Sequence, residues 1–106
     1  MDWGLSMARG VESWRDTPTG EWEEETARFF SAIGAFEEYL ASDATLGCSP
    51  DCLFQGPIAD ALTHVGQIAM LRRVAEAPVR GENYFRAEIV TGRVGREQAE
   101  PRREFD

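Results

Sequence analysis

The sequence predicts an all-α protein, because two long segments carry the apolar periodicity of amphipathic helices. In residues 21–42, and again in residues 57–77, apolar side chains recur at helical spacing. Such spacing places them on one face of a helix with 3.6 residues per turn. Each face needs another element to cover it, so a helical bundle is the expected arrangement. A chain of 106 residues is expected to form one domain, residues 1–106, with a modest core.

The stronger of the two predicted helices runs from Glu21 to Ser42. A Thr-Pro-Thr-Gly break at residues 17–20 precedes it and supplies a capping threonine and a first-turn proline. The glutamates in its first turns suit the positive end of the helix dipole. We expect its buried stripe to consist of Trp22, Thr26, Phe29, Ile33, Phe36 and Leu40.

The second predicted helix runs from Pro57 to Ala77. A Gly-Pro pair opens it, and Pro78 ends it because proline cannot continue a helix. Residues 43–55, which hold Pro50 and both cysteines, are expected to form the connecting loop. We expect the buried face of this helix to consist of Ile58, Ala61, Leu62, Val65, Ile68 and Ala69.

The remaining segments give weaker signals. Residues 3–14 are predicted to form a short helix, which two glycines weaken. Residues 84–90 are predicted to form a brief extended piece. Residues 78–106 as a whole are expected to be a largely irregular tail, whose charged end from residue 97 lies loosely on the surface.

The charge of the chain narrows its possible functions. Nineteen acidic and eleven basic residues give a net charge of −8. Binding to nucleic acid relies on clusters of Lys and Arg that neutralise phosphates, so no nucleic-acid partner is expected. All of the basic residues are Arg, which excludes a lysine Schiff base and a P-loop lysine.

The cellular location is predicted from two kinds of segment that the sequence lacks. No apolar run approaches the roughly 20 residues of a membrane span, and the first residues lack the basic and apolar stretches of a secretory signal. We therefore expect a cytoplasmic protein with no membrane partner. In that compartment Cys48 and Cys52, spaced C-x3-C rather than C-x2-C, are expected to be reduced thiols.

A line of polar residues on the second predicted helix is the candidate site. Asp60, His64 and Gln67 follow i, i+4, i+7 spacing and lie beside the apolar face. A carboxylate and an imidazole one turn apart can bind one divalent metal ion together, and both suit Zn, Ni, Mn or Fe. The alternative is an ordinary surface pair, in which Asp60 orients or charges the imidazole. His64 is the only histidine in the sequence, so any histidine-based catalysis would pass through it.

Two ligands do not make a catalytic metal site, which needs three protein ligands and an open position. The third would have to be a carboxylate such as Glu37 or Glu38, or come from another chain. Arg72 and Arg73, at the end of the same predicted helix, are expected either to interact with the helix dipole or to hold an anion.

The segment from Asp60 to Arg73 contains a His-x-Gly-Gln-x3-Leu-Arg pattern. It resembles the last bundle helix of the DinB-like (YfiT-like) family, and the resemblance extends through residues 21–40 and 82–85, most of the chain. It implies a four-helix bundle that binds a divalent metal, often through three histidines. His64 matches the second histidine of the family's His-x3-His pair, and Asp60 stands in place of the first. The histidine of the family's second helix has no counterpart.

The resemblance implies two functions, between which the sequence does not decide. The first is a divalent-metal-dependent enzyme of unknown substrate, a hydrolase or a thiol-dependent transferase, with Asp60 and His64 as metal ligands and Gln67 beside them. The second is a non-catalytic helical module that self-associates and has lost the metal site.

The resemblance covers only the C-terminal portion of the family, because residues 1–20 are too short for its first two bundle helices. The aromatic stripe of residues 21–42 would then lack the faces that should cover it. Leaving large apolar side chains in water forfeits about 1.5–3 kcal/mol each. We therefore expect a homo-oligomer, a dimer, in which a second copy replaces the missing helices.

Overall fold

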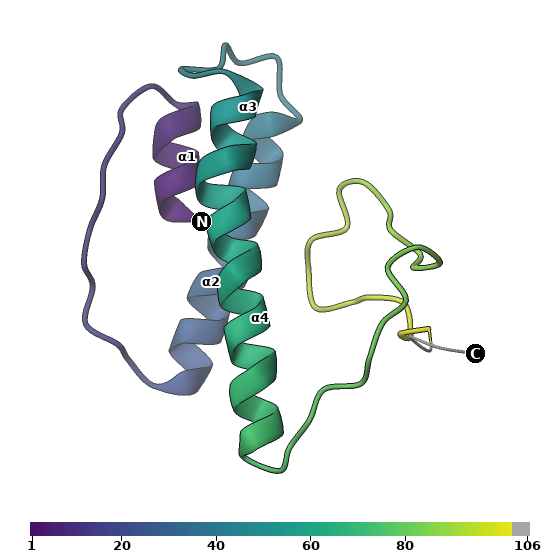
Figure 1. Ribbon diagram of the computed structural model, residues 1–106. Helices are drawn as coiled ribbons and strands as arrows, with labels where there is room; N and C mark the ends of the chain where they lie inside the picture. The colour runs from purple at the N-terminus through teal and green to yellow at the C-terminus, as the bar shows by residue number, and fades with distance from the viewer. Residues whose placement is uncertain (103–106) are drawn as a thin grey trace.

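All regular secondary structure is helical in residues 1–102, the part of the chain that this computed structural model describes (Figure 1). No strand occurs within these residues, which confirms the predicted all-α class. Within the same range, none of the helices has the length and apolar character needed to cross a membrane.

The first two helices are α1, Asp2–Ala8, and α2, Trp22–Leu40. The prediction for α2 is confirmed to within two residues at each end, but the predicted capping threonine and first-turn proline were wrong, since the N-cap residue is Glu21. The prediction of a helix over residues 3–14 was too long, because the chain leaves α1 after Ala8. Gly10 has a φ of 73°, a left-handed conformation that glycine adopts at little cost and that turns the chain away from the helix axis.

A second long helix forms from three segments that follow one another without a break. These are α3, Pro50–Leu53, the π-helical turn η1, Phe54–Ile58, and α4, Ala59–Val74. The prediction of a loop over residues 43–55 was therefore wrong from Pro50 onward. The helix begins there because the Ser49 side chain accepts a hydrogen bond from the backbone N–H of Cys52, 3.3 Å away, and Pro50 occupies the first turn.

The wide turn η1 explains why the Gly-Pro pair was mistaken for a helix start. Pro57 has no backbone N–H and cannot take part in the regular i to i−4 hydrogen bonding of an α-helix. A π-helical turn at this point lets the chain pass Pro57 and continue into α4. Pro57 therefore lies inside a long helix rather than at its beginning.

The end of α4 comes three residues before the predicted boundary at Ala77. Glu76 adopts a φ of 58°, and the backbone N–H of Ala77 donates to the carbonyl of Arg72 at 2.9 Å. This is the hydrogen bond of a Schellman motif, which ends a helix through a left-handed residue. Pro78 follows the motif and is not the residue that stops the helix.

The core lies at the end of the molecule where α1 packs against α2, α3 and η1 (Figure 1). Its buried residues are Ala8 from α1, Phe36 from α2 and Leu53 from α3. The backbone N–H of Gly47 donates to the carbonyl of Ala8 at 2.7 Å and ties the connecting loop to α1. Partly buried residues packed around this core are Met1, Leu5, Met7, Tyr39, Leu46, Cys48 and Ile58.

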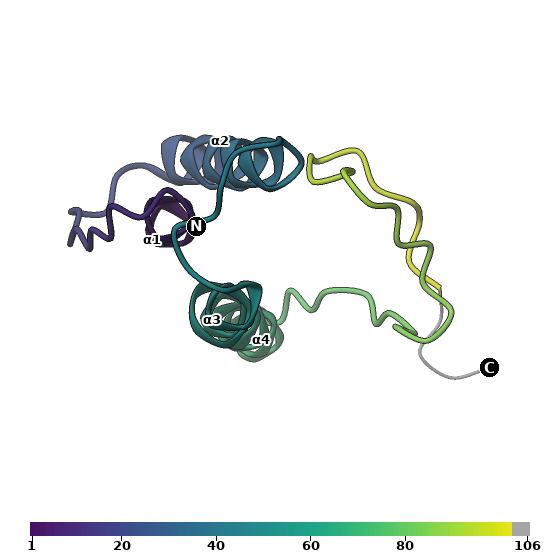
Figure 2. The same ribbon diagram turned by 90° about the horizontal axis from the view of Figure 1, so that it is seen from above.

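The two long helices run in opposite directions, and α2 lies apart from α4 (Figure 1). No Cα atom of α2 lies within 8 Å of a Cα atom of α4. Viewed from above, α2 lies on one side and α3 with α4 on the other, with α1 at a level between them and nearer to α2 (Figure 2). The predicted buried face of the second helix is therefore wrong for a single chain: no residue of α4 is buried, and Leu62, Val65 and Ile68 are all exposed.

Beyond Val74 the chain is irregular through residue 102, as the sequence predicts. The predicted extended piece over residues 84–90 was wrong, since this stretch contains a turn at 84–86 and no strand. The tail returns to α2, where the guanidinium of Arg96 lies 5.4 Å from the centre of the Phe30 ring. The last four residues of the charged end, 103–106, lie outside the described part of the chain.

Candidate functional site

The three polar residues predicted on the second helix do lie together along one line of α4. The Nε2 atom of His64 is 3.6 Å from Oδ2 of Asp60, and its Nδ1 atom is 2.9 Å from Oε1 of Gln67. The first distance is too long for a hydrogen bond, and the second is a good one. The side chains of His64 and Asp60 are 61% and 51% exposed, so the line faces solvent rather than a pocket.

Within residues 1–102, a metal ion at this line would find Asp60 and His64 and no third His, Cys, Asp or Glu ligand. Across residues 1–102, no three His, Cys, Asp or Glu side chains are arranged to hold a metal ion. Glu37 and Glu38, the carboxylates expected to complete the site, belong to α2, which does not approach α4. Residues 1–102 of one chain therefore do not supply the three ligands of a catalytic metal site, and Asp60 and His64 as ligands stay a prediction.

Neither cysteine joins Asp60 and His64 as a metal ligand within residues 1–102. Cys48 is half-buried beside the core and Cys52 is exposed on α3, and both thiols are free. Cys52 belongs to the helix start described above, in which its backbone N–H donates to the Ser49 side chain.

A shallow hollow of about 490 Å³ lies beside α1. It has no histidine or cysteine among its residues, and its one carboxylate, Asp2, lies 3.9 Å from Arg28. The hydroxyls of Ser13 and Thr17 in its lining make no hydrogen bond within the described residues, so no nucleophile there is paired with a base. Its lining consists of Met1, Asp2, Trp3, Ser13, Trp14, Arg15, Thr17 and Arg28.

The main feature of α4 is the apolar surface that it leaves in water. We define the α4 stripe as Ala61, Leu62, Val65, Ile68 and Ala69, which share one face of the helix. The three large members of the stripe are between 51% and 63% exposed. Further exposed apolar side chains, Met70, Leu71 and Val74, lie on the other faces. A helix that is apolar on several sides is normally buried within a larger assembly.

A second exposed apolar surface lies on α2. We define the α2 stripe as Trp22, Phe29, Ile33 and Leu40. Trp22 is 74% exposed, and Phe29 and Leu40 are also exposed, whereas the neighbouring Phe36 is covered by α1. Of the aromatic stripe predicted to be buried, only the part beside α1 is therefore covered within one chain. The α2 and α4 stripes form the candidate functional surface.

This surface was only partly foreseen from the sequence. The apolar residues of both stripes were identified, but those of α4 were expected to be covered by the same chain. A signal in the sequence could have indicated otherwise: Met70, Leu71 and Val74 fall outside the predicted face, so no single intrachain contact could bury all the apolar residues of this helix.

The chain matches no known protein-family model, no curated protein and no solved structure. The fold and the exposed stripes are therefore the observations from which a function is inferred.

Proposed function

We propose that this chain is a non-catalytic helical module of the DinB-like type that functions by self-association, as a homodimer through the α2 and α4 stripes. One observation carries the proposal: α4 is a helix of 16 residues in which no residue is buried. A second copy of the chain would supply the apolar surface that the first copy lacks.

The free energy of apolar burial favours an α4 stripe that is covered by another surface. Most helix stability in proteins comes from tertiary packing of an apolar face rather than from helix propensity. Full burial of a large apolar side chain contributes about 1.5–3 kcal/mol. The large members of the two stripes are each less than fully buried in one chain, so their association with a second copy would stabilise both helices.

The proposal leaves out metal-dependent catalysis because, within residues 1–102, no third His, Cys, Asp or Glu joins Asp60 and His64. The line of Asp60, His64 and Gln67 offers two metal ligands and faces solvent. The surface-pair interpretation of Asp60 and His64 accounts for the arrangement without a metal, since residues one turn apart on a helix face are neighbours.

A matched pair of substitutions on α4 tests the proposal. Leu62→Glu places a carboxylate within the α4 stripe, where an apolar partner surface would have to desolvate it. Thr63→Glu adds the same carboxylate to the next residue, which is exposed and lies outside the stripe. Sedimentation velocity at micromolar concentration should give a dimer for the natural chain and for Thr63→Glu, and a monomer for Leu62→Glu.

Two outcomes would contradict the proposal. A natural chain that is a folded monomer at these concentrations would remove self-association. A divalent metal present in stoichiometric amount in untagged protein, and lost in His64→Ala, would remove the non-catalytic part and favour the metal-dependent enzyme.

A further inference from the structure

We infer that the two copies of the dimer lie side by side with their long helices pointing the same way, so that the acidic start of α2 in one copy contacts Arg72 and Arg73 of the partner copy. The inference rests on the proposed self-association and adds the orientation of the partner and the charges that select it.

The acidic residues at the start of α2 and the arginines at the end of α4 lie at the same end of the molecule. The N-terminal end of α2 and the C-terminal end of α4 are both at the end opposite to the core (Figure 1). Glu21 and Glu23 at the start of α2 and Arg72 and Arg73 at the end of α4 are exposed. Within residues 1–102 none of these four side chains makes an ion pair, although they have opposite charges.

Each pair of charges adjoins an apolar stripe. Successive residues of a helix are about 100° apart, so Glu21 and Glu23 flank the exposed Trp22 on its two sides. Arg72 follows Ile68 by four residues and Arg73 follows Ala69 by four residues, so both arginines continue the α4 stripe. An α2 stripe that packs against an α4 stripe running in the opposite direction therefore brings opposite charges together at one end.

The occupant that these charges fit is a second copy of this chain. A single chain holds α2 and α4 apart, so it does not pair its own charges. In a two-fold dimer with parallel copies, α2 of each copy meets α4 of the other, and the same acidic–basic contact forms twice. An inverted copy would instead bring Glu21 and Glu23 toward the partner's Asp60, where like charges repel.

Charge reversal in two separate chains tests the orientation. One variant carries Arg72→Glu and Arg73→Glu, and the other carries Glu21→Arg and Glu23→Arg. Each homodimer would then bring like charges together at both contacts, and its dissociation constant should rise about 10-fold or more. An equimolar mixture of the two variants places opposite charges at both contacts, so it should form a heterodimer with nearly the natural affinity.

Sedimentation velocity at about 0.05 M and about 0.5 M salt measures these affinities, and high salt should weaken the natural dimer by screening the exposed charges. Natural-affinity homodimers of both variants would overturn the orientation while leaving self-association intact. Two monomeric variants that fail to combine when mixed would also overturn it. A natural chain that stays monomeric would instead overturn the proposed function itself.

Discussion

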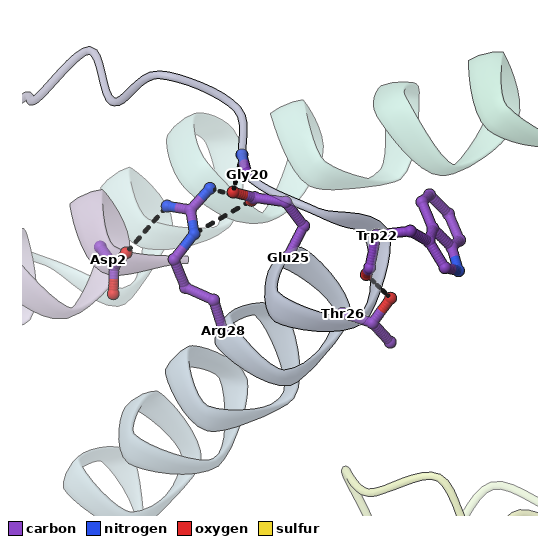
Figure 3. A network of polar contacts seen from close by, with 6 residues as sticks. All are labelled: Asp2, Gly20, Trp22, Glu25, Thr26 and Arg28. Carbon is purple, nitrogen blue, oxygen red and sulfur yellow. Dashed lines mark hydrogen bonds and ion pairs between the residues drawn. The ribbon is translucent and has the colours of Figure 1, made fainter.

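Glu25 holds the first turn of α2 through hydrogen bonds to its carboxylate. The backbone N–H of Gly20 donates to Oε1 of Glu25 at 2.9 Å, and the guanidinium of Arg28 donates to Oε2 (Figure 3). Arg28 also lies 3.9 Å from Asp2, which connects this turn to α1. The hydrogen bond from Gly20, followed by the one from Arg28, lowers the pKa of Glu25.

The substitution Glu25→Gln should reduce stability at neutral pH and have little effect in acid. A carboxyl group whose pKa is lower in the folded chain stabilises the fold fully at pH values above its unfolded pKa of about 4.3. That stabilisation is lost as the pH falls through the lower, folded value. Urea unfolding at about pH 7 and about pH 3, at one protein concentration, should show the difference between variant and natural chain shrinking in acid.

The neighbouring substitution Glu24→Gln is the control. Glu24 is exposed and makes no hydrogen bond or ion pair within the described residues. It should therefore change stability only slightly at either pH. An effect of Glu25→Gln that is equally large at both pH values would show that its carboxylate charge is not what stabilises the turn.

The short helix α1 determines how the two long helices are placed. Gly4 is the residue that lets α1 approach both of them. A Cβ atom at Gly4 would lie 3.1 Å from Cβ of Pro57 and 3.2 Å from the Phe36 ring. These contacts are tighter than side chains normally make, so only glycine fits between α2 and η1 without displacing one of them. The short α1 therefore packs between the two long helices and separates them.

The substitution Gly4→Val should lower the free energy of unfolding by about 1–3 kcal/mol, because it overpacks this contact. Gly34→Val is the matched control, since a Cβ atom there meets nothing within 4 Å. In mid-helix, valine is favoured over glycine by a few tenths of a kcal/mol, so the control should be neutral or slightly more stable. Thermal unfolding measures both, and equal stabilities would show that α1 does not pack through Gly4.

The elements differ in how well local sequence specifies them. The sequence predicted α2 closely, because an acidic first turn and a long apolar stripe are both local signals. It missed the start of α3, where Ser49 and Pro50 form a helix start within a segment that composition marks as a loop. It also misplaced Pro57, because a π-helical turn that tolerates an internal proline has no signature in the periodicity.

For the molecule as a whole, residue spacing predicts neighbours within a helix but not the distance between helices. Asp60, His64 and Gln67 lie in line as predicted, because i, i+3 and i+4 relations depend on helix geometry alone. The exposure of the α4 stripe depends on the separation of α2 and α4, which α1 and η1 set through contacts distant in sequence. The sequence therefore predicted the residues of the candidate surface but not that one chain leaves them uncovered.

If a second copy covers α4, the stability of this helix should depend on protein concentration. A dimer is stabilised by mass action, so each tenfold rise in concentration adds about 1.4 kcal/mol and should raise Tm by roughly 3–6 °C. Circular dichroism from about 1 to 100 μM should show this rise in the natural chain and not in Leu62→Glu. Dilution should also speed amide hydrogen exchange in Ala59–Val74 earlier than in the C-terminal part of α2 around Phe36. Phe36 is buried within one chain, whereas no residue of α4 is. A Tm that does not change over this range, with α4 protected as well as the core, would show that α4 is stable without a partner.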